Sequence, residues 1–249
     1  MSELVQIRRE GSVCVLRLNR PAKLNAISTA VERALQDALA GDDVCGSACV
    51  VVAGEGRAFC AGADVSEFAE RDADAVLRYY RESGGVYEQL ARLSQPTVSA
   101  VHGYCLGGGL ELALATDFRI ADETAVLGFP EVGIGILPSS GGTARTARLL
   151  GAARAKQLIL LGTRVDAREA LAVGLVTEVV EEGGAVARAL EVAQALAELP
   201  PAAVAVAKQA IDAAAESSHE GALLIERLAY GLLAQTAAAR EAADRVAER

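Results

Sequence analysis

The sequence predicts one α/β unit of 249 residues. Short apolar runs and apolar–polar alternation, typical of strands, occur between helical stretches through the first two thirds of the chain. Helical spacing dominates the last third, and this order favours an α/β class. The connecting segments are short, so we expect no separable second domain. We place a core over residues 1–195 and a helical C-terminal region of the same unit over residues 196–249.

The first elements are predicted from local patterns. Residues 4–9 and 13–18 alternate between apolar and polar, and the intervening Glu10-Gly11-Ser12 turn indicates a hairpin. Ser28 or Thr29 is expected to cap a helix that runs to about residue 40. A short buried strand is expected over residues 48–53, ended by a Gly-Glu-Gly turn.

The middle of the chain continues the same rhythm. We expect a helix over 74–93, a buried strand over 97–104, a helix over 110–115, short strands over 118–121 and 125–128, and a last strand over 175–180. Everything else from residue 143 onward is predicted to be helical, including 202–214 and 221–249. A loose strand–strand–helix rhythm near 13–40, 48–70 and 97–115 suggests stacked, similar turns.

Net charge and cysteine content argue against several partners and indicate a cellular compartment. Lys and Arg number 24 against 33 Asp and Glu, giving a net charge of −9, which argues against nucleic acid or an anionic membrane as partner. The five cysteines are odd in number and resemble no disulfide framework, which favours a reducing compartment. The N-terminus lacks the apolar run of a secretory signal, and no membrane span is evident. We therefore expect a soluble cytoplasmic protein.

The motifs that are absent from the sequence argue against several kinds of catalytic and binding chemistry. The chain contains neither a P-loop nor a Gly-x-Ser-x-Gly nucleophile turn, and its nearest dinucleotide-type run ends in Pro138 instead of glycine. His102 is expected to be a packed, hydrogen-bonded histidine at a strand end. Cys45 and Cys49 have no second pair with which to bind zinc, so no metal site is expected. The remaining chemistry must use carboxylates and backbone groups.

Three segments could supply that chemistry. The run Phe59-Cys60-Ala61-Gly62-Ala63-Asp64 follows a strand and, taken alone, favours a tight turn. The glycines at 107–109 lead from a strand into a helix, where free N–H groups favour an anion or oxyanion. Glu111 lies on the same helical face as Gly108, so a carbonyl bound by the Gly108 N–H would have its neighbouring carbons near that carboxyl.

The third segment surrounds Glu131 with apolar residues. A carboxyl among Phe129, Val132 and Ile134 would have a raised pKa, which suits a general acid, although a surface turn is an equal alternative. Two carboxylates and two backbone donors would together suit reversible addition across an activated double bond. Whether they converge in space is left open by the sequence.

These segments resemble the enoyl-CoA hydratase/isomerase (crotonase) superfamily. The matching blocks follow the family order and cover nearly the whole chain: residues 18–26, 58–64, 103–113, 129–133 and 138–143, and later Leu161-Gly162 and Ala170-x-x-x-Gly174-Leu175-Val176. The resemblance implies a spiral of strand–strand–helix turns followed by a helical trimerisation region. It also implies homotrimers or hexamers that act on acyl-CoA thioesters, with coenzyme A as part of the substrate and no separate cofactor.

The resemblance also implies residue roles. The backbone N–H groups of Ala63 and Gly108 would hold the thioester oxygen, Glu111 would act as base on water, and Glu131 would donate a proton to the α-carbon. Contacts on the coenzyme A side would come from Lys23, Leu24, Ala61, Asp64 and Val65. Ser139 and Ala144 replace the glycine and glutamine usual in the family, and the usual C-terminal aromatic tail is missing.

Both glutamates are present, so the leading interpretation is a 2-enoyl-CoA hydratase. A 3,2-enoyl-CoA isomerase typically keeps only the second glutamate and is one alternative, beside a decarboxylase or thioester hydrolase of the same fold. A third interpretation is a protein of another class, either a non-catalytic interaction protein or an RNA-binding protein with this fold. The net charge of −9 argues against it.

Overall fold

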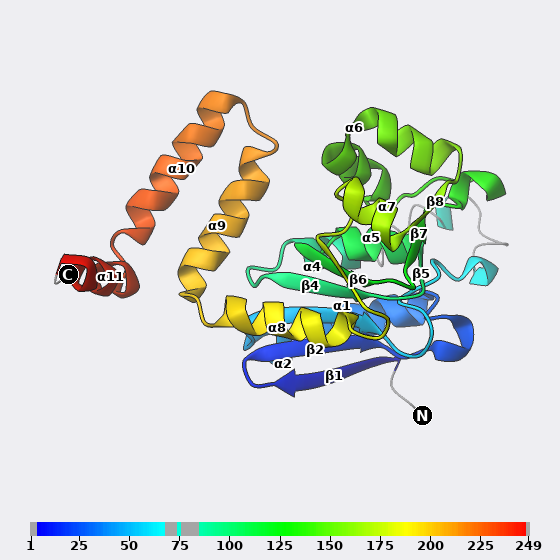
Figure 1. The fold of residues 1–249 in the computed structure, drawn as a ribbon, viewed down its shortest axis with the longest axis horizontal. Coiled ribbons are helices and arrows are strands. Elements are labelled where there is room, and N and C mark those ends of the chain that lie inside the picture. Colours follow the sequence, from blue (N-terminus) through cyan, green and yellow to red (C-terminus); the bar gives the residue numbers. More distant parts are fainter. Residues whose placement is uncertain (1–3, 68–73, 76–84, 248–249) are drawn as a thin grey trace.

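A six-stranded sheet forms the centre of the molecule (Figure 1). The computed structural model describes residues 4–67, 74–75 and 85–247. The predicted hairpin is confirmed, since β1 (Val5–Glu10) pairs antiparallel with β2 (Val13–Leu18). The remaining neighbours are parallel, in the order β1-β2-β3-β4-β6-β9, with β3 at Cys49–Gly54, β4 at Thr97–Val101, β6 at Phe118–Asp122 and β9 at Glu178–Val180.

A second, smaller sheet shows that the predicted turns stack. It contains β5 (Tyr104–Leu106), β7 (Val126–Gly128) and β8 (Arg164–Asp166). Isolated parallel bridges extend the same pattern, joining Ile27 to Ala63 and Cys60 to Cys105. Each turn of the chain therefore returns beside the preceding turn.

Helices cover both faces of the large sheet. Along β2, Val13 and Val15 belong to one buried cluster while Cys14 and Leu16 belong to the other, as strand alternation requires. The first cluster is covered by α8 (Ala185–Ala197), whose buried alanines at 185, 189 and 193 let the helix approach the strands closely. The second is covered by α1 (Thr29–Ala40), α4 (Val86–Ala91) and α5 (Gly108–Leu114).

The N-terminus of α1 follows the predicted cap. Ser28 Oγ accepts a hydrogen bond from the N–H of Val31 at 3.3 Å. The other α-helices of the body within the described residues are α2 (Asp42–Cys45), α6 (Gly142–Leu160, kinked at Gly151) and α7 (Ala167–Ala172).

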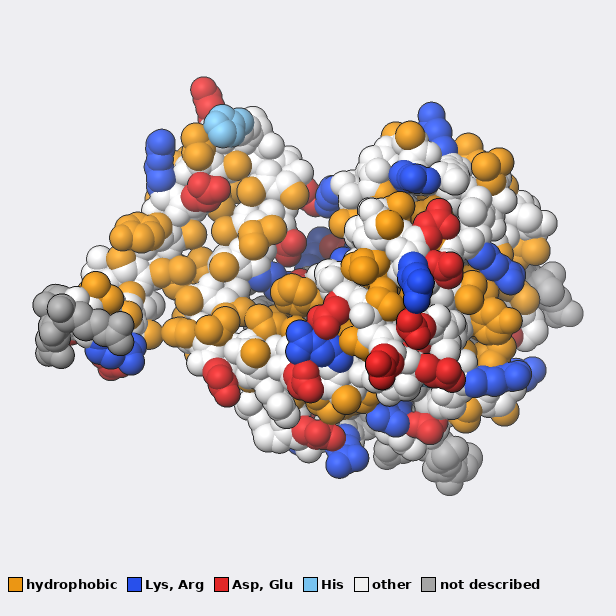
Figure 2. Space-filling view, viewed as in Figure 1, with side chains coloured by type: hydrophobic (Ala, Val, Ile, Leu, Met, Phe, Trp, Pro, Cys, Tyr) orange, Lys and Arg blue, Asp and Glu red, His pale blue; other side chains and the backbone are white. Residues whose placement is uncertain are grey.

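The chain ends in a helical arm that extends away from the body (Figure 1). The arm comprises α9 (Pro201–Ala214), α10 (His219–Leu233) and α11 (Ala237–Ala247), and α10 packs on α9. Lys208 of α9 ties it to the body, because its buried ammonium lies 2.8 Å from Asp117 Oδ2. Apolar side chains remain exposed on the arm (Figure 2): Ile211, Leu224, Leu228, Tyr230 and Leu232.

Two expectations about secondary structure are wrong. The strand expected over 97–104 is divided, because Gly103 has a φ of +53° and turns the chain from β4 into β5 of the other sheet. Residues Arg164–Asp166 form β8 within a region expected to be wholly helical. A three-residue strand carries no readable periodicity, since its extended shape comes from pairing with β7.

The remaining differences concern the ends of elements, and β9 begins at Glu178 instead of residue 175. The helix expected over 74–93 is described only in part, as α4, and its residues 76–84 lie outside the described ranges. The helix expected over 221–249 is interrupted between α10 and α11. Among the described residues, no single helix has the length and apolarity to cross a membrane, and α8 and α9 meet that test only jointly, with a 109° bend between them.

Candidate active site

Two backbone donors meet because two successive turns of the chain are in register. The parallel bridge between Cys60 and Cys105 aligns their strands, and Ala63 and Gly108 each lie three residues further along. A Cβ on Gly108 would stand 3.3 Å from the nitrogen of Ala63, so the two amides are close neighbours. Within the described ranges, neither N–H donates to a protein acceptor. The pair can therefore bind one oxygen.

Glu111 is held in the first turn of α5 by backbone amides. Its side chain is 4% exposed, and Oε1 accepts hydrogen bonds from the N–H groups of Ser140 (2.7 Å) and Gly142 (2.8 Å). Burial raises the pKa of Glu111, while these two amides and the nearby charge of Arg145 oppose that rise. Both bonds end on Oε1, so Oε2 is the oxygen that can face a ligand.

Glu131 packs against the glycine turn that precedes α5. It begins the short helix η3 (Glu131–Ile134), and burial together with the charge of Glu111 raises its pKa to about 7. A Cβ on Gly107 would lie only 2.6 Å from Glu131 Oε1. Gly107 also has a φ of +51°, which strongly favours glycine. Oε2 is buried and makes no hydrogen bond to any described residue.

The predicted rise in the pKa of Glu131 is confirmed, but its expected surroundings are partly wrong. Phe129 is buried, whereas Val132 and Ile134 are exposed. The carboxyl is buried because it folds back onto Gly107, a contact between two turns that no local apolar pattern reveals. Glu111 and Glu131 are close enough for the charge of Glu111 to raise the pKa of Glu131.

The residues predicted on the coenzyme A side lie along one edge of this site. Leu24 O accepts a hydrogen bond from the N–H of Ala61 at 2.9 Å, so these two residues are neighbours. Lys23 and Val65 are exposed and can meet a ligand. The carboxylate of Asp64 contacts Arg20 Nη1 at 2.8 Å and Ser66 Oγ at 2.6 Å, which makes it a support for the backbone beside Ala63.

Several residues of the family blocks support the site in ways that the sequence did not indicate. Arg20 holds both Asp64 and the carbonyl of Ala26, and buried Asn25 donates to the carbonyl oxygens of Glu55 and Ala58. The amides of Ser140 and Gly142 were also missed as partners of Glu111. Both lie in the family block Pro138–Thr143, but nothing in that block indicated that their amides donate to Glu111. His102 is hydrogen bonded as expected, with Nε2 2.9 Å from the carbonyl oxygen of Gly56.

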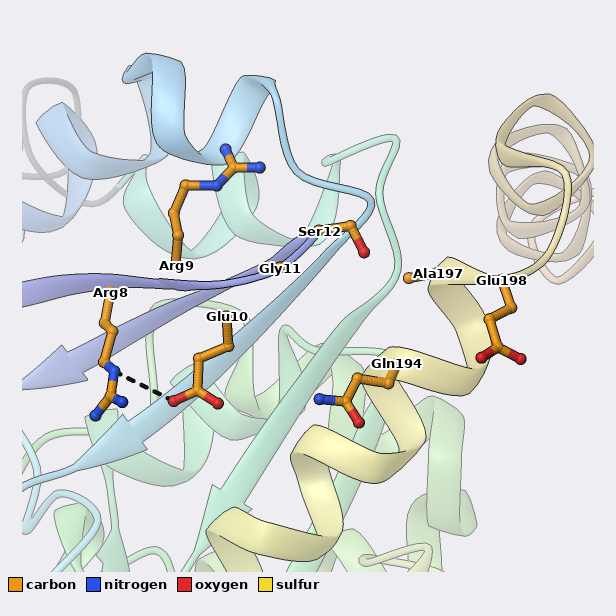
Figure 3. Close-up of a pocket in the computed structure, with 8 residues that line it drawn as sticks. All are labelled: Arg8, Arg9, Glu10, Gly11, Ser12, Gln194, Ala197 and Glu198. Carbon is orange, nitrogen blue, oxygen red and sulfur yellow. Dashed lines mark ion pairs between the residues drawn. The ribbon is translucent and has the colours of Figure 1, made fainter.

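The hollow drawn in Figure 3 lies away from these carboxylates. It is formed at the β1–β2 turn and the end of α8, where Arg8 and Glu10 make an ion pair of 3.3 Å. Its lining consists mostly of solvated polar side chains and contains none of the catalytic candidates. In the described part of the chain, no group of three His, Cys, Asp or Glu residues could hold a metal ion.

Comparison with known proteins agrees with the resemblance seen in the sequence. The pattern of the enoyl-CoA hydratase/isomerase family matches residues 8–249. The 2,3-dehydroadipyl-CoA hydratase of Escherichia coli is 39% identical over 95% of this chain and 92% of its own length. The short-chain-enoyl-CoA hydratase of Clostridium acetobutylicum is 38% identical over 91% of this chain and 88% of its own.

Solved structures give the same result for the fold. The crystal structure of enoyl-CoA hydratase from Bacillus anthracis superposes with a TM-score of 0.91 at 35% identity, covering 98% of this chain and 96% of that one. The α/β class and the spiral expected from the resemblance are therefore confirmed, as is the assignment to a group of enzymes. The chain belongs to the enoyl-CoA hydratase/isomerase family.

Proposed function

We propose that the protein is a 2-enoyl-CoA hydratase that adds water across the 2,3 double bond of an acyl-CoA thioester. The observation that carries this proposal is the pair of buried carboxyls beside two backbone amides that donate to none of the described residues. Similar proteins named hydratases, from Escherichia coli and Clostridium acetobutylicum, support the reaction class. Coenzyme A enters as part of the substrate, and the proposal requires no further cofactor.

In this mechanism, the thioester oxygen accepts hydrogen bonds from the N–H groups of Ala63 and Gly108. Glu111 takes a proton from a water molecule, and the water oxygen forms a bond to C3. The electron pair of the double bond moves onto the thioester oxygen, where the two amides stabilise the negative charge. Glu131 then gives its proton to C2, which restores the carbonyl and completes the addition of H and OH.

The surroundings of the two carboxyls favour different protonation states. With a pKa of about 7, Glu131 retains its proton in a large fraction of molecules at neutral pH. Burial raises the pKa of Glu111 too, but the two amides on Oε1 and the Arg145 charge oppose that rise and favour its ionised form. Adjacent carboxyls also resist ionising together. One base and one acid can therefore coexist at the same site.

The proposal includes an assembly of homotrimers, or hexamers built from two trimers, in the cytoplasm. The exposed apolar side chains of the C-terminal arm support an assembly, because exposed patches of this kind usually meet a partner. The arm also buries little of its own surface against the body (Figure 2). Light scattering at micromolar concentration should give a multiple of three chains, and a monomer would contradict this part of the proposal.

The test of the reaction uses Glu111→Gln and Glu131→Gln. Glutamine keeps the size of the side chain but cannot exchange protons in this way, so each variant should hydrate crotonyl-CoA about 10²–10⁴-fold more slowly. Loss of the absorbance of the conjugated enoyl group measures the rate. Because the two residues act on the same water, the double variant should be little slower than the worse single variant.

The isomerase alternative gives a different result with the same proteins. One carboxyl suffices to move a proton between two carbons, so Glu111→Gln would remain active in 3-enoyl-CoA isomerisation while Glu131→Gln would not. Both reactions should be measured on all three variants, with acyl-CoA binding as the control for an intact site. Wild-type hydration by Glu111→Gln would refute the hydratase role of Glu111.

A further inference from the structure

The guanidinium of Arg145 contacts the loop that holds Glu111. Arg145 lies in the first turn of α6, and its side chain is 19% exposed. Its Nη1 donates to the carbonyl oxygen of Ser140 at 3.0 Å, and its Nη2 lies 2.8 Å from Glu88 Oε2 on α4. Arg145 therefore connects the loop at Ser140 to a different helix.

The contacts of Arg145 fall within the same three residues that hold the carboxylate. The N–H groups of Ser140 and Gly142 both donate to Glu111 Oε1. Between them, a side chain on Gly141 would collide with Arg145 Nη1, so the guanidinium lies directly against this residue. A second tether, from Thr143 Oγ1 to the carbonyl oxygen of Pro138 (2.9 Å), closes the start of the loop.

We propose that Arg145, anchored by Glu88, is a positioning residue that holds the Ser140–Gly142 amides against Glu111 and so orients this carboxylate for the reaction. This inference rests on the proposed function and goes beyond it, since the contacts of Arg145 are with the carbonyl oxygen of Ser140 and the carboxylate of Glu88. It acts through the backbone of Ser140.

Arginine suits this task better than lysine. Its planar guanidinium can donate to two acceptors in fixed directions, whereas a lysine ammonium is a single point charge. Here one nitrogen meets a carbonyl and another meets a carboxylate. Glu88 also pairs with Arg92, whose Nε lies 2.8 Å from Glu88 Oε1. This second ion pair restricts the movement of the Glu88 side chain.

The anchoring helix also reaches the other half of the site. Tyr87, next to Glu88 on α4, places its hydroxyl 3.2 Å from the position of a Cβ on Gly108. The contacts that run from Glu88 through Arg145 to Ser140, which we call the clamp, therefore connect the loop that holds Glu111 to α4, the helix beside Gly108. Movement of the Ser140 loop relative to α4 would separate the base from the bound carbonyl.

Arg145 also affects the charge of Glu111. Among the described residues, Arg145 favours the ionised form of Glu111 and is itself paired with Glu88, while Glu131 and Glu111 disfavour ionising together. Removal of the guanidinium should therefore raise the pKa of Glu111. The acid limb of the kcat/KM profile should then move to higher pH, which a loss of folded protein alone would not cause.

The experiment compares Arg145→Met and Arg145→Lys with Arg148→Met. Arg148 lies on the same helix but pairs with Glu216 at the surface, so it serves as the matched control. For Arg145→Met we expect kcat for crotonyl-CoA hydration to fall about 10- to 100-fold, the cost of misplacing a catalytic group by a fraction of an ångström to one ångström. KM should change little, Arg145→Lys should recover part of the loss, and Arg148→Met should behave as wild type.

Glu88→Gln tests the anchor without altering α6. Glu88 is half-exposed, so this variant should fold even where Arg145→Met does not. Its kcat should fall less than that of Arg145→Met, and the double variant should be no slower than Arg145→Met alone, because both changes break one clamp.

A direct measurement separates this inference from the proposed function. Carboxyl ¹³C NMR titration reports the pKa of Glu111 with no reaction taking place, and Arg145→Met should raise that pKa. If the wild-type protein does not hydrate enoyl-CoA, the proposed function is wrong, but the titration still tests whether Arg145 acts on Glu111. An unchanged Glu111 pKa, or wild-type kcat in folded Arg145→Met, would overturn the inference.

Discussion

A single methyl group at Gly107 should disable the acid while leaving both glutamates in place. In Gly107→Ala the new Cβ would lie 2.6 Å from Glu131 Oε1, whereas ordinary contacts begin near 3.4 Å, so the carboxyl must move by about 0.8 Å. A displacement of that size at a catalytic group costs on the order of 10²-fold in rate. We therefore expect kcat for hydration to fall by about that factor.

The same substitution also strains the backbone. Alanine at a φ of +51° costs roughly 1–3 kcal/mol, which corresponds to a fall in Tm of about 2–12 °C for a chain of this size. Gly174→Ala is the matched control, because Gly174 has a φ of +80° and a Cβ there meets nothing within 4 Å. The control should lose stability but keep its kcat.

The assay is steady-state hydration of crotonyl-CoA at a temperature where both variants are folded by circular dichroism. The expected result is a selective loss of kcat in Gly107→Ala. Wild-type kcat in that variant would show that Glu131 tolerates the displacement, and equal losses in both variants would show that backbone strain alone explains the effect. Either result would refute the reasoning.

Three further predictions concern the backbone donor Gly108, the buried acid Glu131, and Lys208, which joins the C-terminal arm to the body. Gly108→Pro removes one N–H and should lower kcat about 10²–10³-fold, whereas Gly108→Ala, which adds a Cβ but keeps the donor, should lose less. Burial raises the pKa of Glu131 from 4.5 to about 7, so the protonated acid is favoured in the folded state. The contribution of Glu131 to the free energy of unfolding should then be fully present below pH 4.5 and fall by up to about 3 kcal/mol as pH rises to 7, so urea titrations should find the wild type losing stability over this window relative to Glu131→Gln. Lys208→Met leaves Asp117 without its buried cation and should cost about 3 kcal/mol in urea unfolding, while exposed Lys156→Met should cost nothing measurable.

Features that depend on neighbours in the sequence were predicted from the sequence alone. The hairpin and the Ser28 cap are both confirmed. Gly108 and Glu111 both lie in the first turn of α5, because helix geometry places residues three apart on one face. The family motifs also identified the two glutamates and the glycine run.

Features that depend on contacts between turns were decided only by the tertiary structure. Ala63 meets Gly108 because Cys60 and Cys105 are in register, and strand register is a property of pairing across 45 residues of chain. Glu131 acquires its raised pKa by packing on Gly107, while the local apolar residues Val132 and Ile134 point outward. Arg145 reaches Glu88 on another helix, which no spacing along the chain could indicate. The sequence by itself determined which groups were available for chemistry, and the packing of successive turns determined which of them share a site, because burial and register arise only when distant segments meet.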